Sequence, residues 1–151
     1  MTFFKHVLSR LGLSQAEAVA FLNQFPGPDG KEVNLGKLKK WCAGKTTQAP
    51  GWVWPYLFDL AEKQDTAALI FAEEWDKIGQ PDVFEFGLAS DDFEAQTLGW
   101  PCVGAHLAVA ARIWEMTGAE MRIAPRATTP ASAASADLRE GHVEIKRTRG
   151  N

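Results

Sequence analysis

The sequence of 151 residues is poor in cysteine. Its two cysteines, Cys42 and Cys102, lie sixty residues apart, and neither belongs to a Cys-x-x-Cys pair or to a Cys/His cluster. Zinc sites and the disulfide frameworks of small secreted domains are built from such groupings. We therefore expect two free thiols, buried or half-buried, and no structural zinc.

Long hydrophobic runs are missing as well. Every apolar stretch is interrupted within about ten residues, whereas a membrane-spanning helix needs about twenty. The opening residues, Met1 to Lys5, lack the charged and then apolar layout of a secretory signal. The expectation is a cytoplasmic protein without a membrane segment.

Arrangements typical of catalysis are also scarce. His6, His106 and His142 stand alone, with no Ser, Cys or carboxylate at a spacing that indicates a nucleophile or a metal site. One alternative is a small metal-dependent enzyme that uses the acids of residues 91–94, although acids at a helix start more often interact favourably with the helix dipole. We expect no enzymatic activity, no cofactor and no metal.

The net charge of −3 hides an uneven distribution along the chain. Residues 1–64 hold eight Lys/Arg against five Asp/Glu, a charge of +3, and residues 65–126 hold four against eleven, a charge of −7. The last part, residues 127–151, is rich in Thr, Pro, Ser and Ala at its start, carries +1, and ends in a basic tail. Such asymmetry favours a polyanion as the partner of the first part, and it divides the chain into three expected regions, 1–64, 65–126 and 127–151.

The most informative segment is a short helix that begins at Asn34. An Asn at the N-cap accepts a hydrogen bond from the first free backbone N–H groups, and Gly44 supplies the left-handed residue that commonly ends a helix. Leu38 and Trp41 form its apolar side, and lysines occupy the other side. Upstream, Ser14 and Glu17 form the S-x-x-E pattern of a capping box, which predicts a helix from Ser14 to Leu22.

These features resemble the Cro/lambda-repressor-like (Xre-type) helix-turn-helix family over about residues 3–62. The resemblance rests on Gly12-Leu13-Ser14-Gln15-Ala16-Glu17 and on the register V-N-x-x-x-L-x-x-W-x-x-G-K from Val33 to Lys45. In the family a tight turn joins the two helices, whereas residues 23–32 lengthen it here by about nine residues; the entropic cost of a longer loop grows only with the logarithm of its length. The resemblance implies a sequence-specific regulator of transcription, a repressor, that binds double-stranded DNA.

The resemblance also implies which residues meet DNA. The helix from Asn34 would enter the major groove, where Lys pairs with guanine and Asn with adenine. Residues expected to face the bases are Asn34, Leu35, Gly36, Lys37 and Lys40. Residues expected to hold phosphates are Gln15, Lys39, Lys45, Thr46 and Thr47.

The expected fold is mainly α: an N-terminal helix-turn-helix bundle of four to five helices, plus a smaller C-terminal α(+β) domain. A fourth helix is expected at residues 56–61 and a separate one at 67–78, capped by Asp65 or Thr66. Further expected elements are a strand at Val83–Leu88, a helix from Pro101 to Thr117 and a brief strand at 121–123. Residues 142–147 alternate, so they are expected to form an edge strand or a basic tail.

Operators of this family usually contain two half-sites, so the resemblance implies a homodimer. We expect the interface within residues 65–126, on the helix face formed by Val103, Leu107, Ala111 and Trp114. The alternative function is a protein-interaction module or an antitoxin-like protein, in which the lengthened turn prevents groove docking and the acidic part binds a protein partner.

Overall fold

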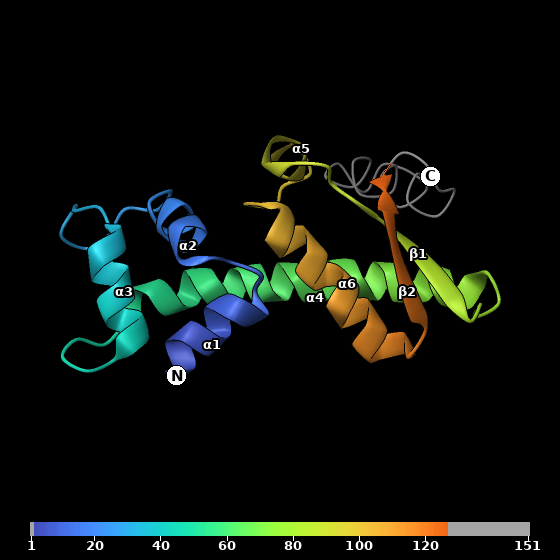
Figure 1. Ribbon diagram of the computed structural model, residues 1–151, viewed down its shortest axis with the longest axis horizontal. Helices are drawn as coiled ribbons and strands as arrows, with labels where there is room; N and C mark the ends of the chain where they lie inside the picture. The colour runs from blue at the N-terminus through green and yellow to red at the C-terminus, as the bar shows by residue number, and fades with distance from the viewer. Residues whose placement is uncertain (1, 127–151) are drawn as a thin grey trace.

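The computed structural model describes residues 2–126, which are mainly helical with a small parallel sheet (Figure 1). The described residues form six α-helices, a single 3-10 turn and two strands. In chain order the elements are α1 (Phe3–Arg10), α2 (Gln15–Leu22), α3 (Leu35–Ala43), η1 (Gly51–Val53), α4 (Trp54–Lys77), β1 (Val83–Leu88), α5 (Asp92–Thr97), α6 (Val103–Thr117) and β2 (Glu120–Pro125). No helix within residues 2–126 has the length and apolar character to cross a membrane.

The helices α2 and α3 begin and end where the sequence predicts. Ser14 and Glu17 form the complete capping box of α2, with Ser14 Oγ accepting from the Glu17 backbone N–H at 3.1 Å and Glu17 Oε1 accepting from the Ser14 N–H at 2.9 Å. Both caps of α3, Asn34 and Gly44, are also confirmed. Local side-chain chemistry therefore suffices to define these elements.

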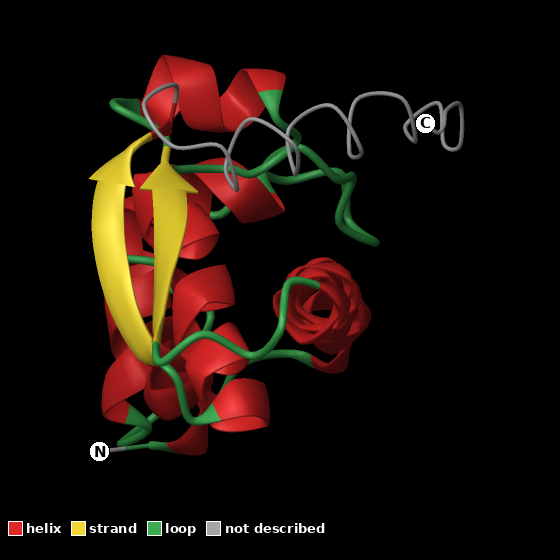
Figure 2. Cartoon of the chain, turned by 90° about the vertical axis from the view of Figure 1, so that its right-hand side faces the viewer, coloured by secondary structure: helices red, strands yellow, loops and turns green. Residues whose placement is uncertain are grey.

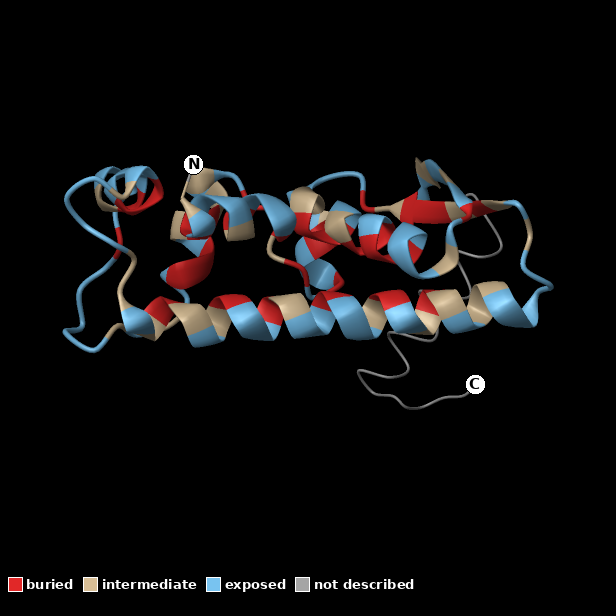
Figure 3. Ribbon diagram, turned by 90° about the horizontal axis from the view of Figure 1, so that it is seen from below, coloured by how far each residue is buried: buried red, intermediate tan, exposed pale blue. Residues whose placement is uncertain are grey.

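The prediction of two helices at 56–61 and 67–78 is wrong, because α4 runs without a break for 24 residues. Asp65 does not cap a helix; its Oδ1 instead accepts a hydrogen bond from Arg112 Nη1 of α6 at 2.5 Å. Buried residues follow one side of α4 along its length (Figure 3), among them Leu57, Gln64 and Phe71. The expected division between residues 64 and 65 thus falls in the middle of a continuous helix.

After α4 the chain forms a β-α-β unit. The strands at Val83–Leu88 and Glu120–Pro125 are confirmed as elements; they pair in parallel, with Val83 opposite Glu120 and Leu88 opposite Pro125 (Figure 2). Two parallel strands need a long crossover connection, which α5 and α6 supply. The expected start of α6 at Pro101 is wrong by two residues, because Cys102 is the N-cap.

One hydrophobic core extends across both halves of the chain. Leu8, Leu38 and Leu57 of the first half belong to the same buried cluster as Phe86 and Ile113 of the second half. Both cysteines are free and buried, as expected. The two halves therefore share their interior.

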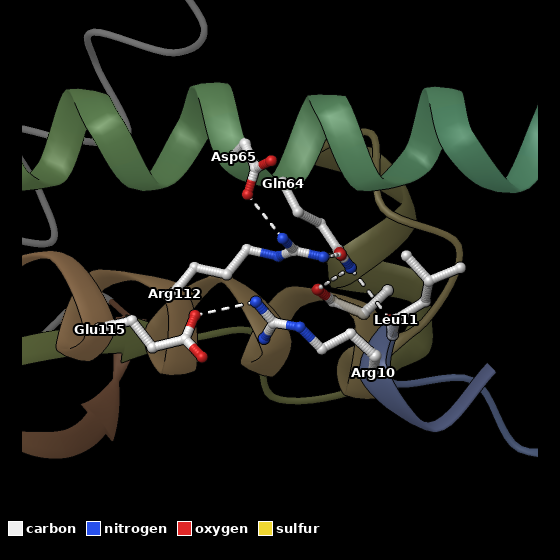
Figure 4. A network of polar contacts seen from close by, with 7 residues as sticks. Arg10, Leu11, Gln64, Asp65, Arg112 and Glu115 are labelled. Carbon is white, nitrogen blue, oxygen red and sulfur yellow. Dashed lines mark hydrogen bonds and ion pairs between the residues drawn. The ribbon is translucent and has the colours of Figure 1, made fainter. Parts of the chain in front are cut away.

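A buried polar network lies at the junction of α1, α4 and α6 (Figure 4). Gln64 is fully buried, and its Nε2 donates to the carbonyl oxygens of Leu11 and Ala105, each at 3.0 Å. Its Oε1 accepts from Arg112 Nη2 at 2.9 Å. Gln64 thus satisfies a carbonyl left free at the end of α1, and it adds a second hydrogen bond to a carbonyl in the first turn of α6.

Three expectations lie outside the described residues: the low-complexity segment that begins at 127, the strand or basic tail at 142–147, and the setting of His142.

Candidate nucleic-acid interface

The helix predicted to meet DNA, α3, is held by its apolar side. Leu38 is fully buried and Trp41 nearly so, at 0% and 4% exposure, and the Phe4 ring of α1 meets the Trp41 ring edge-on with centroids 6.0 Å apart. Trp41 is therefore a core residue, and α1 supports α3 from behind.

The end of α3 is fixed by Thr2. Thr2 Oγ1 donates to the carbonyl oxygen of Cys42 at 2.8 Å and also accepts from the Lys5 backbone N–H at 3.1 Å, so one hydroxyl joins the start of α1 to the end of α3. Gly44 ends the helix with a φ of +66°, and a Cβ at this position would lie 2.6 Å from Thr2 Cγ2. Only glycine satisfies both the backbone conformation and this close approach.

The opposite side of α3 faces solvent. Asn34, Leu35, Gly36, Lys39 and Lys40 are exposed, and Lys37 is half-buried. Within residues 2–126, no carboxylate forms an ion pair with any of the four lysines at positions 37, 39, 40 and 45. Lys45, Thr46 and Thr47 follow the helix and are also exposed. The structure therefore brings the expected contact residues onto one outer surface.

Asn34 is the residue whose expected role the geometry restricts. Its Oδ1 accepts from the Lys37 backbone N–H at 2.7 Å as the N-cap of α3. Recognition of adenine by Asn uses both the amide oxygen and the amide nitrogen. The cap engages one lone pair of Oδ1 and fixes the orientation of the amide, so a base must approach Asn34 in the orientation that the helix imposes.

Gln15, expected to hold a phosphate, is the first residue of α2 and is half-buried. Its side chain forms a hydrogen bond with the Cys42 thiol of α3. Burial raises the pKa of that thiol, and the Gln15 contact opposes this shift. Gln15 therefore links the first turn of α2 to the last turn of α3.

The lengthened turn is closed at its base by one side chain, a feature that the sequence reasoning missed. Asn23 Nδ2 donates to the Val33 carbonyl oxygen at 2.9 Å, and Asn23 Oδ1 accepts from the Val33 N–H at 2.8 Å. This pair of bonds, which we call the Asn23–Val33 clamp, joins the end of α2 to the start of α3 much as a short turn would. The only sequence feature that could have indicated this clamp is Asn23, which directly follows α2.

Within the loop, Phe25 stacks on Tyr56 of α4 with ring centroids 4.1 Å apart. The Lys31 backbone N–H bonds to the Asp29 carboxylate at 2.9 Å and lowers its pKa, with smaller contributions from the charges of Lys31 and Lys37. Asp29 thus adds one acid to the loop that precedes α3, without an ion pair to the lysines of α3 in the described residues.

The expected dimer face lies on the outer side of α6. Leu107 and Trp114 are 42% and 56% exposed, Ala111 is exposed and Val103 is half-buried. The inner side of α6, which includes Val109 and Ile113, packs in the core. The four expected residues therefore share one helix face that meets solvent.

The acids of the metal-enzyme alternative each make a bond within the fold. Asp91 caps α5 by accepting from the Glu94 N–H at 2.8 Å, and Asp92 accepts from the Val103 N–H at 2.9 Å. Glu94 accepts from the Ser90 N–H at 2.7 Å, which lowers the pKa of its carboxyl. In the described part of the chain, no group of three or more His, Cys, Asp or Glu side chains is placed to hold a metal ion.

Comparison with known proteins gives no family for this chain: no protein-family model and no curated protein matches its sequence. Its function must therefore be argued from α3 and the surfaces around it.

Proposed function

We propose that this protein is a sequence-specific regulator of transcription, a repressor, that binds double-stranded DNA with α3 in the major groove. The observation that carries the proposal is the division of α3 into an anchored side and an outer side whose lysines have no carboxylate partner in residues 2–126. A helix buried on one side and cationic on the other is the usual element for major-groove reading.

The exposed residues divide into two expected roles. Lys37 and Lys40 donate to guanine O6 and N7, and Leu35 contacts a thymine methyl group. Lys39, Lys45, Thr46, Thr47 and Gln15 bind phosphates and fix the register on the duplex. Each neutralised phosphate adds about one unit to the slope of log affinity against log salt concentration.

Two further observations support this docking. The Asn23–Val33 clamp closes the lengthened turn at its base, so the ends of α2 and α3 stay together despite the longer connection. The helix α3 also lies near one end of the molecule, whereas the sheet of the acidic half lies near the other end (Figure 1). This separation keeps most of the −7 charge of residues 65–126 away from the phosphates.

The test is selection of bound DNA from a random pool, followed by gel-shift measurement on the selected site. We expect K37A and K40A each to weaken specific binding by about tenfold or more, because a good base contact contributes roughly 1–3 kcal/mol of discrimination. The matched control is K77A, which removes an exposed lysine at the far end of α4. Equal and weak binding by the parent protein and both variants would overturn the proposal.

The second candidate function is a protein-interaction module, including an antitoxin-like role. The observation that favours it is the exposure of Leu107 and Trp114 on the acidic half, since exposed apolar residues with a charged surround are typical of protein-binding surfaces. In that case K37A and K40A would leave the function unchanged, and substitution of Trp114 would abolish capture of the partner.

A further inference from the structure

A pocket of about 610 Å³, which we call the central pocket, lies between α2, α4 and the segment that joins α5 to α6. Four aromatic residues, Phe21, Phe25, Tyr56 and Trp100, contribute to its lining, together with several polar side chains. Sites for small molecules are typically concavities of about 300–1,000 Å³ that are mostly apolar, with a few polar groups that orient the ligand. The central pocket has this size and this mixture of residues.

The lengthened turn forms one wall of the central pocket, and contacts hold it in place. The Asn23–Val33 clamp closes the turn, and Phe25 stacks on Tyr56 with ring centroids 4.1 Å apart. Further along, a Cβ on Gly27 would lie 3.4 Å from the Trp52 ring, so the turn also packs against η1. The wall is therefore formed before a ligand binds, which lowers the entropic cost of binding.

A positive charge is held at the opposite wall. Lys63 of α4 donates from Nζ to the Gly99 carbonyl oxygen, and the same Nζ lies 4.9 Å from the centre of the Trp100 ring. Gly99 has a φ of +92°, and a Cβ on it would lie 2.9 Å from Lys63 Nζ. Glycine at this position thus leaves room for the ammonium group, which keeps a defined place in the lining.

A negative charge, Asp59, lines the same pocket one helical turn away from Lys63. An acid and a lysine four residues apart on a helix are neighbours and can form an ion pair. Asp59 nevertheless forms no ion pair within residues 2–126, because Lys63 instead contacts Gly99 and Trp100. The helix α4 therefore presents two opposite charges to one pocket, close together but not joined.

We propose that the central pocket binds a free amino acid with an aromatic side chain. The ligand's carboxylate lies toward Lys63, its ammonium lies toward Asp59, and its ring packs against the aromatic lining. An amine alone would be repelled by Lys63 and a carboxylate alone by Asp59, whereas a zwitterion is attracted by both. The attraction to Lys63 acts through its charge, so the bond to Gly99 is kept. No residue of α3 lines this pocket, so the inference does not depend on the proposed function.

The experiment is isothermal titration calorimetry of the full chain at neutral pH, without DNA. The probes are L-phenylalanine, L-tyrosine and L-tryptophan, together with two analogues of L-phenylalanine. Hydrocinnamate lacks the ammonium group, and phenethylamine lacks the carboxylate. We expect at least one of the three amino acids to bind, and both analogues to bind at least about tenfold more weakly than L-phenylalanine, because each loses one interaction with a charged group.

Two matched variants locate the site. D59N removes the charge of Asp59 and keeps its shape, and E62Q removes the charge of an exposed residue of α4 that does not line the central pocket. We expect D59N to weaken amino-acid binding about tenfold without weakening the binding of hydrocinnamate, and E62Q to bind as the parent protein does. Circular dichroism checks that both variants are folded.

Three outcomes would each overturn the proposal. The first is the absence of binding by all three amino acids at millimolar concentration. The second is an analogue that binds as tightly as L-phenylalanine, because the paired charges would then not select the ligand. The third is an equal loss of affinity in D59N and E62Q, which would mean that the ligand binds elsewhere.

Discussion

At the scale of single residues, the two cysteines show how burial controls chemistry. Burial raises the pKa of the Cys102 thiol to about 11, and its Sγ lies 3.7 Å from the Gly12 carbonyl oxygen. Burial also raises the pKa of Cys42. The reactive species of a thiol is the thiolate, so both groups are expected to be unreactive in the folded protein.

This expectation is measured with a thiol-specific chromogenic reagent at pH 8. Native protein should react slowly at both cysteines, and protein unfolded in denaturant should react fully and fast, because unfolding removes the burial and restores an ordinary pKa. An added exposed thiol, S9C, is the control that the reagent works on the folded chain. Rapid reaction of the native protein at Cys102 would contradict the described burial.

At the scale of elements, the contact between the α1–α2 turn and α6 depends on two glycines. Gly12 has a φ of +77°, and a Cβ on it would lie 2.0 Å from the Gly104 carbonyl oxygen. A Cβ on Gly104 would lie 2.2 Å from the Gly12 carbonyl oxygen. Two backbone segments therefore touch directly, and side chains cannot move aside to make room.

We expect G104A to destabilise the fold by about 3 kcal/mol, at the upper end of the usual cost of overpacking, because the clash is with backbone. The matched control is G51A, since nothing lies within 4 Å of a Cβ at Gly51. Thermal unfolding of the two variants measures the difference. Equal midpoints for G104A and the parent protein would show that α6 does not approach the turn as described.

Elements with local signals could be predicted from the sequence, and those with distant partners could not. Ser14, Asn34 and Gly44 act on backbone groups within a few residues, so their pattern identifies α2 and α3. Asp65 shows the opposite case, because an acid before Thr66 is typical of a helix start, yet its partner is Arg112, which lies 47 residues away.

The same reason applies to the candidate interface. The exposed lysines of α3 follow from helical periodicity, and the structure places them outward. The Asn23–Val33 clamp depends on a contact between two segments that sequence spacing does not bring together. A residue pattern can predict which side of a helix is exposed, but which other segments lie beside that side is decided by tertiary packing.

At the scale of the whole molecule, α4 joins the basic and acidic halves into one folded unit. Its buried side belongs to a single core that includes Leu8 and Ile113, and Gln64 binds carbonyls of both halves. The basic and acidic halves therefore share one continuous core.

We expect one unfolding transition, with the same midpoint by far-ultraviolet circular dichroism and by tryptophan fluorescence. Q64L should lower the free energy of unfolding by roughly 3 kcal/mol, because two buried carbonyls and Arg112 lose a partner, and it should shift both probes equally. The matched control is Q48L, at an exposed loop position. Two separate transitions, of which Q64L moves only one, would contradict a shared core.

The Asn23–Val33 clamp has a practical consequence. The clamp closes the loop between Asn23 and Val33, and at Gly30 within this loop nothing lies within 4 Å of an added Cβ. A small fluorophore or epitope inserted at Gly30 should leave the packing of the helices unchanged, and it would lie close to the start of α3. It would give a reporter on the bound duplex, readable in real time.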